Sequence, residues 1–274
     1  MSVPQDEHFS GLRSVPVAHL GQREYPILEF DPSAEALLEP NRLIKPADVP
    51  ERCVLCFFRE MIDQLVSDGR GEEIAALHSE MGRHPIYEIQ VNGQRVAVAH
   101  PGLGGPLAAG TLEEIIALGC RKFVVCGSAG VLHRELAVGH LIVPIAAVRD
   151  EGTSYHYLPP SRQVDADAHG IQAVERVLRR QNIPYLLAKT WTTDAFYRET
   201  RAKIVARRAE GCVTVEMEAA AFFAVARFRG VPLAQILYGG DDCSGDLWDS
   251  RHYHTREEIR RRLFELACEA SLEL

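Results

Sequence analysis

Two carboxylates flank a methionine in the segment Val215-Glu-Met-Glu-Ala-Ala-Ala221, where an apolar strand gives way to an Ala-rich helix. Apolar residues press on both sides of the segment, so the carboxylates are expected to be buried, and a buried carboxylate needs partners. Two kinds of partner fit these residues. An arginine would form a structural salt bridge, whereas the two adjacent hydroxyls of a ribose could both donate to one carboxylate.

Strands and helices alternate on both sides of this segment. Apolar periodicity predicts strands at 53–58, 86–91, 95–100, 123–126, 141–148, 185–191, 213–216 and 232–238. It predicts helices at 59–79 (broken near Gly69 and Gly71), 107–118, 166–181, 217–229 and 254–271. Asn92-Gly93 between two alternating segments is typical of a β-hairpin. The alternation predicts an α/β domain with a mixed sheet.

Residues 1–50 have a different character. Prolines interrupt them at positions 4, 16, 26, 32, 40, 46 and 50, and no helical or strand period is visible. We therefore expect an extended N-terminal arm at 1–50, which either wraps its own domain or reaches a neighbouring subunit, and one α/β domain at 51–274.

Acidic residues outnumber basic ones, with 38 Asp and Glu against 30 Lys and Arg and a formal net charge of −8. This balance disfavours a broadly basic surface for nucleic acid. No apolar run approaches the roughly 18 residues of a membrane helix. The first ten residues are too polar for a signal peptide. We expect neither a nucleic-acid nor a membrane partner.

The seven cysteines indicate a reducing compartment, which predicts a cytoplasmic protein. Their number is odd, and most lie in apolar stretches, as is typical of buried free thiols. Cys53 and Cys56 have the C-x-x-C spacing, but no second pair completes a zinc site. Residues three apart on a strand point to opposite faces, so structural thiols are expected rather than a redox pair.

Four further segments follow predicted strands, at the carboxyl ends where open α/β sheets bind ligands. They are His100-Pro-Gly-Leu-Gly-Gly-Pro106, Val125-Cys-Gly-Ser-Ala-Gly-Val131, Trp191-Thr-Thr-Asp-Ala-Phe-Tyr197 and Tyr238-Gly-Gly-Asp-Asp-Cys243. Together they offer backbone amides, a hydroxyl, an aromatic ring for stacking and an acid. Each segment taken alone also fits an ordinary tight turn or core packing.

Taken together, these segments resemble the nucleoside phosphorylase family, specifically its hexameric purine-nucleoside and uridine phosphorylase group. The resemblance runs from about Cys53 to the C-terminus and includes the Glu-Met-Glu segment and Val148-Arg-Asp-Glu-Gly-Thr-Ser154. Nucleosidases that cleave methylthioadenosine share that fold. In the arm, His19-Leu-Gly21 is similar to a family segment whose histidine reaches a neighbouring subunit's ribose 5′-hydroxyl.

The resemblance implies a single-domain three-layer sandwich around a twisted mixed β-sheet. It implies an enzyme of purine salvage, a pentosyltransferase that cleaves the N-glycosidic bond of a nucleoside with phosphate and gives free base and ribose 1-phosphate. Phosphate is then a co-substrate, and no metal or organic cofactor is expected. A homo-oligomer, either a dimer or a trimer of dimers, is implied as well.

The resemblance also implies roles for individual residues around the sugar and the base. Glu218 would hold the 2′- and 3′-hydroxyls, Met217 would pack on the ribose, and Glu216 would support this end of the site. Phe196 would stack on the base. Asp241 would protonate a purine leaving group if burial behind the apolar strand before it raises its pKa.

On the phosphate side, the resemblance implies contacts from Ser128 and from the amide of Gly127. Uridine phosphorylases read the pyrimidine with a Gln and an Arg, which have no clear counterpart after Tyr197. Together with the aspartate at Asp241, this absence favours purine substrates.

The sequence departs from the family at two phosphate-binding elements. The segment 56–62 lacks the family's Gly-Asp-Pro loop and the arginine that closely follows it, and Val125 replaces an arginine. Compensation could come from Arg59, Arg83 or Arg149. Alternatively, water is the nucleophile and the protein is a nucleosidase, or the chain binds nucleosides without turnover.

Overall fold

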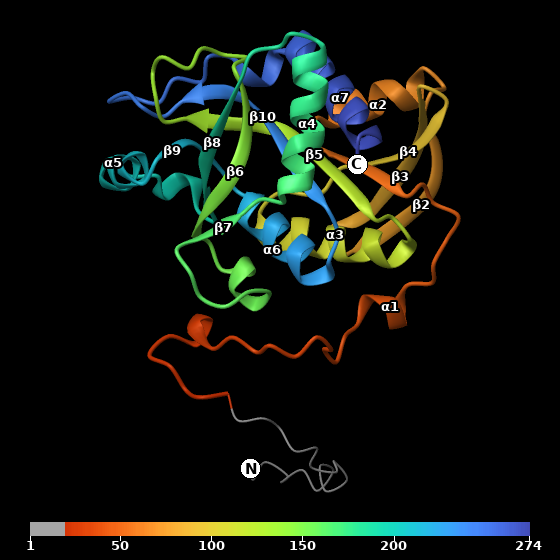
Figure 1. Ribbon diagram of the computed structural model, residues 1–274, viewed down its shortest axis with the longest axis horizontal. Helices are drawn as coiled ribbons and strands as arrows, with labels where there is room; N and C mark the ends of the chain where they lie inside the picture. The colour runs from red at the N-terminus through yellow and green to blue at the C-terminus, as the bar shows by residue number, and fades with distance from the viewer. Residues whose placement is uncertain (1–19) are drawn as a thin grey trace, which may run out of the picture.

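The computed structural model describes residues 20–274, which fold into one curled sheet with helices on both faces (Figure 1). The strands are β1 (Arg52–Cys56), β2 (Glu72–Ser79), β3 (Gly82–Val91), β4 (Gln94–Ala99), β5 (Lys122–Val131), β6 (Leu141–Asp150), β7 (Gln163–Asp165), β8 (Tyr185–Thr193), β9 (Cys212–Glu216) and β10 (Leu233–Asp242). The α-helices are α1 (Pro40–Leu43), α2 (Arg59–Ser67), α3 (Gly105–Leu118), α4 (Ala168–Arg180), α5 (Arg201–Ala209), α6 (Ala219–Arg229) and α7 (Glu257–Leu272). Short 3₁₀ helices are η1 (Pro26–Leu28), η2 (Thr153–His156), η3 (Phe196–Arg198) and η4 (Tyr253–Thr255).

The sheet is mixed and closes on itself at one end. Its strand order is β10-β6-β8-β9-β5-β1-β4-β3-β2, and β7 pairs with β6. β10 pairs in parallel with β5 as well as antiparallel with β6, so β5, β9, β8, β6 and β10 form a closed ring. The predicted mixed sheet is therefore correct, and it curls further than an open sheet would.

Two apolar cores lie on opposite faces of the sheet. One lies between the sheet and α2, α4 and α7, and the other lies beneath α3 and α6. Figure 1 shows α4 and α7 above the sheet and α3 and α6 below it. Cys56 belongs to the first core and Cys53 to the second, so the two thiols point to opposite faces as predicted.

The predicted helix at 59–79 is wrong in its second half. The helix α2 ends at Ser67, and Gly69 then takes a left-handed backbone with φ of +67°. The following residues form β2, which pairs antiparallel with β3 and extends the predicted Asn92-Gly93 hairpin into a three-stranded edge. This pairing is non-local, and it overrides the helical periodicity of the segment.

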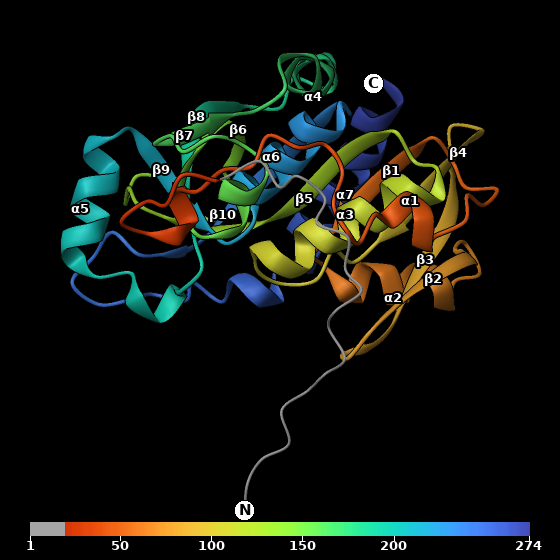
Figure 2. The ribbon, with the colours of Figure 1, turned by 90° about the horizontal axis from the view of Figure 1, so that it is seen from below.

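The described part of the arm lies against its own domain. Ile27 lies close to Gly152, beside η2: its Cδ1 is 3.5 Å from the position that a Cβ on this glycine would take. The Ala47 amide donates a hydrogen bond to Leu118 O at the end of α3. Seen from below, the arm crosses the face that carries α3 and α6 (Figure 2). His19 lies outside the described residues.

Within residues 20–274, no helix is both long and apolar enough to cross a membrane.

Replacing Gly170 by alanine should destabilise the fold, because an added Cβ would lie 2.8 Å from the Leu233 carbonyl oxygen where α4 packs on β10. We expect a loss of about 1–3 kcal/mol in the free energy of unfolding, measured in urea. Gly110→Ala is the matched control, since this exposed glycine of α3 has nothing within 4 Å of an added Cβ. The control should gain about 0.5–1 kcal/mol. Equal effects of the two substitutions would contradict the packing described.

Candidate active site

The candidate site lies at a gap along one edge of β5. β1 covers this edge as far as the Cys56–Cys126 pair, and β9 covers it from the Gly130–Val215 pair onward. Among the described residues, no strand pairs with 127–129 on that edge, whereas β10 covers the opposite edge. The carboxyl ends of β1 and β9 therefore face each other across three residues of β5.

Main-chain hydrogen bonds fix which amides face the gap. Phe57 N donates to Cys126 O at 3.1 Å, and Leu132 N donates to Val213 O at 2.9 Å. Strand residues alternate in direction, so Ser128 shares the orientation of these two residues and turns its amide toward the gap. The same alternation turns the amide of Gly127 toward β10. The missing side chain of Gly127 lets the Phe57 ring pack closely on β5, because an added Cβ would lie 3.0 Å from that ring.

Glu216 holds the junction between β9 and α6. Its Oε2 accepts hydrogen bonds from the amides of Glu218 and Ala219, at 2.7 and 2.6 Å, and its Oε1 accepts one from Thr192 Oγ1 at 2.6 Å. Thr192 Oγ1 in turn accepts from the Ala220 amide at 3.0 Å. Amides at the start of a helix have no intrahelical partners, so this carboxylate caps α6 and fixes the direction in which its first turn faces.

Glu218 is the carboxylate that this cap places beside the gap. It is 4% exposed, and its Oε1 accepts a hydrogen bond from the Gly104 amide at 2.6 Å. Its Oε2 has no hydrogen-bond partner within residues 20–274. β9 ends at Glu216, one residue beyond its pairing with Gly130, so Met217 is the first residue past the strand at the gap. Glu218 and the half-buried Met217 therefore lie just past the end of β9, on the side of the gap in β5.

Burial governs the charge state of this pair. It raises the pKa of Glu218 to about 8, and the neighbouring Glu216 carboxylate adds to the increase. Burial also raises the pKa of Glu216, but its bonds from Thr192 and from two amides stabilise its charged form. Both carboxyls are therefore harder to ionise than exposed ones, and the hydrogen bonds to Glu216 favour the charged form of that residue. Within residues 20–274, no arginine forms an ion pair with either carboxylate, so the salt-bridge alternative does not hold there.

The predicted base-side residues come from the ends of β8 and β10. Phe196 in η3 is 48% exposed and packs on Tyr197, with 4.1 Å between ring centroids. Asp241 is the last residue but one of β10, and its Oδ2 accepts hydrogen bonds from Trp248 Nε1 at 2.6 Å and from Cys243 Sγ at 3.5 Å. Oδ1 of Asp241 has no partner among the described residues and is available to a ligand.

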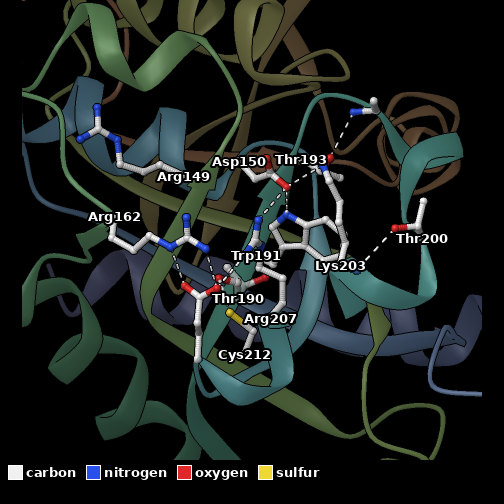
Figure 3. A network of polar contacts seen from close by, with 12 residues as sticks. Arg149, Asp150, Arg162, Thr190, Trp191, Thr193, Thr200, Lys203, Arg207 and Cys212 are labelled. Carbon is white, nitrogen blue, oxygen red and sulfur yellow. Dashed lines mark hydrogen bonds and ion pairs between the residues drawn. The ribbon is translucent and has the colours of Figure 1, made fainter. Parts of the chain in front are cut away.

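Arg149 is directed into its own loop. Its guanidinium donates four hydrogen bonds, to Ser154 Oγ, Leu158 O, Pro159 O and Ser161 Oγ. The residue is only 5% exposed. Figure 3 shows Arg149 pointing away from the neighbouring Asp150. In this arrangement Arg149 braces the loop after β6, and its donors are not free for phosphate.

Asp150 anchors α5 to the sheet. Its Oδ2 accepts from Trp191 Nε1 at 3.1 Å, Lys203 Nζ at 2.9 Å and Arg207 Nη2 at 3.1 Å (Figure 3). Burial alone would raise the pKa of Asp150, but the two cations outweigh it and hold that pKa below its usual value. The network fixes the start of α5, and with it the chain that follows Phe196.

The other two arginines considered for phosphate differ in their surroundings. Arg83 pairs with Glu73 on the β2–β3 hairpin. Arg59 begins α2, two residues after Phe57, and is exposed. It makes no ion pair within residues 20–274. It lies close enough to His100 to contribute, after burial, to a lowered pKa of that histidine. Arg59 is therefore the one of the three whose charge is not already matched among the described residues.

Several residues of this region received no individual role in the sequence analysis. Gly104 and Thr192 lie in two of the predicted loop segments, but only the structure shows that they bond to Glu218 and Glu216. Trp248 donates a hydrogen bond to Asp241, and Glu199 reaches the same region through Cys243. Neither contact is visible in the sequence. Within residues 20–274, no group of three or more His, Cys, Asp or Glu side chains is arranged to hold a metal ion.

The family model of the phosphorylase superfamily matches residues 51–271. The chain belongs to this superfamily. The predicted family, the α/β fold and an enzyme of the pentosyltransferase kind are thereby confirmed.

Individual relatives are similar to the chain at low identity. Guanosine phosphorylase of Halorubrum lacusprofundi is 24% identical over 231 residues, which are 82% of this chain and 95% of that protein. Uridine phosphorylase of Thermococcus kodakarensis is 30% identical over 166 residues, 61% of this chain and 59% of that protein. The crystal structure of AMP nucleosidase from Bacteroides thetaiotaomicron has a TM-score of 0.65 at 20% identity, covering 81% of this chain and 87% of that one. That likeness concerns the fold.

Replacing Glu218 by glutamine should stabilise the free protein at alkaline pH. The folded pKa of about 8 lies above the ordinary 4.5. The contribution of this carboxyl to stability is thus fully present below pH 4.5 and is lost as the pH rises through about 8. Glutamine can keep the bond from Gly104 and cannot ionise. Urea unfolding at about pH 5 and about pH 8.5 should show a gain for the variant that is larger at the higher pH. A gain independent of pH would contradict the assignment.

Proposed function

We propose that the protein is a nucleoside phosphorylase that cleaves the N-glycosidic bond of a purine nucleoside and releases free base and ribose 1-phosphate. One observation carries the proposal: Glu218 presents an unpartnered carboxylate oxygen beside Met217 and the gap at Ser128. A buried carboxylate with one oxygen fixed and the other free suits two adjacent hydroxyl donors. Belonging to the phosphorylase superfamily supports the same chemistry.

The reaction places opposite charges on its two products as the bond breaks. Positive charge develops on the sugar, and the Glu218 carboxylate stabilises it most when the pair of hydroxyls is bound and the group is ionised. The electron pair of the bond moves to the base. Asp241 Oδ1 would then supply a proton or hydrogen bond to the purine, while Phe196 would cover one face of the ring.

Phosphate needs donors and positive charge on the other side of the sugar. The Ser128 amide faces the gap, and Arg59, which forms no ion pair within residues 20–274, lies three residues after the end of β1. We assign phosphate binding to these two residues, with the Ser128 hydroxyl as a third contact. The amide of Gly127 would take no part, because it turns toward β10. No metal or organic cofactor enters this scheme.

Hydrolysis by water is the second candidate, and Phe57 favours it. Its ring lies against Gly127 and makes edge contacts with His100 and Phe222. An apolar ring at this place narrows the space in which an anion would approach β5. The nucleosidase alternative therefore has a specific structural basis.

Purine preference rests on Asp241, because a purine leaves more readily when a nitrogen of the base accepts a proton. A relative named guanosine phosphorylase supports this choice, and one named uridine phosphorylase supports the pyrimidine alternative. We further propose a cytoplasmic homo-oligomer. The seven free thiols, all buried, fit a reducing compartment, and exposed Leu37 and Leu38 on the arm fit contact with a second copy.

The function is tested by incubating the protein with inosine, guanosine, adenosine and uridine, with and without phosphate, and identifying the sugar product. We expect purine release that requires phosphate and yields ribose 1-phosphate. Phosphate-independent release of ribose would establish the nucleosidase alternative. Tight nucleoside binding without release of any base would identify a silent binding protein, and preference for uridine would overturn the purine assignment.

The ribose role is tested with Glu218→Ala. We expect kcat/KM to fall by about 10²-fold or more, because the contact between charge and hydroxyl strengthens as the sugar becomes positive. The exposed Glu80→Ala on the β2–β3 turn is the control and should keep its activity. Turnover near wild type for Glu218→Ala would refute the ribose assignment.

A further inference from the structure

Both tryptophans of the chain donate their indole N–H to an aspartate, but in opposite surroundings. Trp191 Nε1 donates to Asp150 at 3.1 Å, where two basic side chains bind the same carboxylate (Figure 3). Trp191 is fully buried, so packing accounts for its place. Trp248 Nε1 donates to Asp241 at 2.6 Å, yet Trp248 is 63% exposed. Burial therefore does not explain why this second ring is held at its carboxylate.

The backbone holds Trp248 beside the end of β10. Asp242 and Asp249 form an isolated β-bridge with two main-chain hydrogen bonds, of 2.8 and 3.1 Å. Trp248 directly precedes Asp249 in the chain. Arg201, the first residue of α5, holds the same loop through an ion pair with Asp246 at 2.5 Å. A closed and anchored loop thus brings the indole to its carboxylate.

The two oxygens of Asp241 have different surroundings. Oδ2 accepts hydrogen bonds from Trp248 Nε1 at 2.6 Å and from Cys243 Sγ at 3.5 Å, whereas Oδ1 has no partner within residues 20–274. A thiol is a weak donor, so the indole makes the stronger of the two bonds. No cation pairs with Asp241 among the described residues, unlike Asp242, which pairs with Arg251 at 2.5 Å. Because donors occupy Oδ2, a proton carried by this carboxyl group lies on Oδ1.

We propose that Trp248 is a positioning residue that holds Oδ2 of Asp241 and so directs Oδ1, with its proton, toward the purine base. The inference rests on the proposed function, in which Asp241 assists the departure of the base. The two oxygens of a carboxyl group are bonded to one carbon, so a base atom that binds Oδ1 lies next to the indole that binds Oδ2. The base therefore meets the edge of the exposed Trp248 ring when it binds.

The indole also stabilises the charge that the proton transfer leaves behind. As the bond between the sugar and the base nitrogen breaks, its electron pair stays on the base. The Oδ1–H bond of Asp241 breaks and an N–H bond forms on the purine, so negative charge appears on the carboxylate. A donor already in place on Oδ2 stabilises that charge without having to move. After the base has left, the carboxylate takes one proton back from the solvent.

The first test compares Trp248→Phe and Trp248→His on inosine and on 7-methylguanosine. Phenylalanine keeps an aromatic ring and loses the donor, so kcat on inosine should fall about tenfold while KM changes less than about threefold. 7-Methylguanosine releases a base that needs no proton, so its turnover should change less than about twofold. Histidine restores a ring N–H and should recover most of the loss. Leu247→Ala, at the even more exposed neighbouring residue, should match wild type on both substrates.

A readout independent of turnover is the indole N–H resonance of Trp248 in the NMR spectrum of isotope-labelled protein. The chain has two tryptophans, so two indole resonances are expected, and Trp248→Phe assigns them. Adding hypoxanthine, a product that cannot be cleaved, should move the Trp248 resonance. The resonance of Trp191 should stay in place, because its indole bonds to Asp150. Asp241→Asn should also move the Trp248 resonance, since an amide oxygen is a weaker acceptor than a carboxylate.

The outcomes separate this inference from the proposed function. Equal loss on both substrates, full activity of Trp248→Phe on inosine, or a Trp248 resonance that hypoxanthine does not move would overturn the role of Trp248. A moved resonance in a protein that releases no base from any nucleoside would support the place of Trp248 beside the base and overturn the proposed function. If Trp248→Phe does not fold, Trp248→His assigns the resonance and the hypoxanthine titration decides.

Discussion

The hydrogen bonds that Glu216 accepts at the start of α6 determine the geometry of the whole candidate site. Amides of the first helical turn must find acceptors when they are buried, and here one carboxylate serves two of them. Thr192, at the end of β8, fixes the other oxygen of that carboxylate. The junction therefore ties β8, β9 and α6 together. Glu218 lies at the start of this capped turn, and its side chain faces the Gly104 amide.

The candidate site collects carboxyl groups that form no ion pair with an arginine or lysine within the described residues. Glu216 and Glu218 lie on the proposed sugar side, and Glu199 and Asp241 lie on the proposed base side. Such an arrangement costs folding stability, because buried carboxylates are poorly solvated. It suits a substrate whose sugar becomes positive and whose base needs a proton. The same groups that lower stability would then act on opposite ends of one breaking bond.

Local signals were sufficient to predict the parts of the fold that depend on local chemistry. The Glu-Met-Glu segment at a strand–helix junction and the Asn92-Gly93 hairpin both appear where periodicity and turn residues place them. The strand β2 was missed because its pairing with β3 decides its conformation. The gap in β5 could not be predicted, since it depends on where two distant strands stop pairing. The link between Glu199 and Asp241 passes through Cys243, which had been assigned only a structural role.

The central claim is that the free oxygen of Glu218 receives ribose hydroxyls at the edge of β5. A crystal structure of the protein with a bound purine nucleoside tests it most directly. The account predicts the 2′- and 3′-hydroxyls at about 2.7 Å from Glu218 Oε2, with the base between Phe196 and Asp241. A nucleoside bound elsewhere, or one whose hydroxyls make no contact with Glu218, would contradict it.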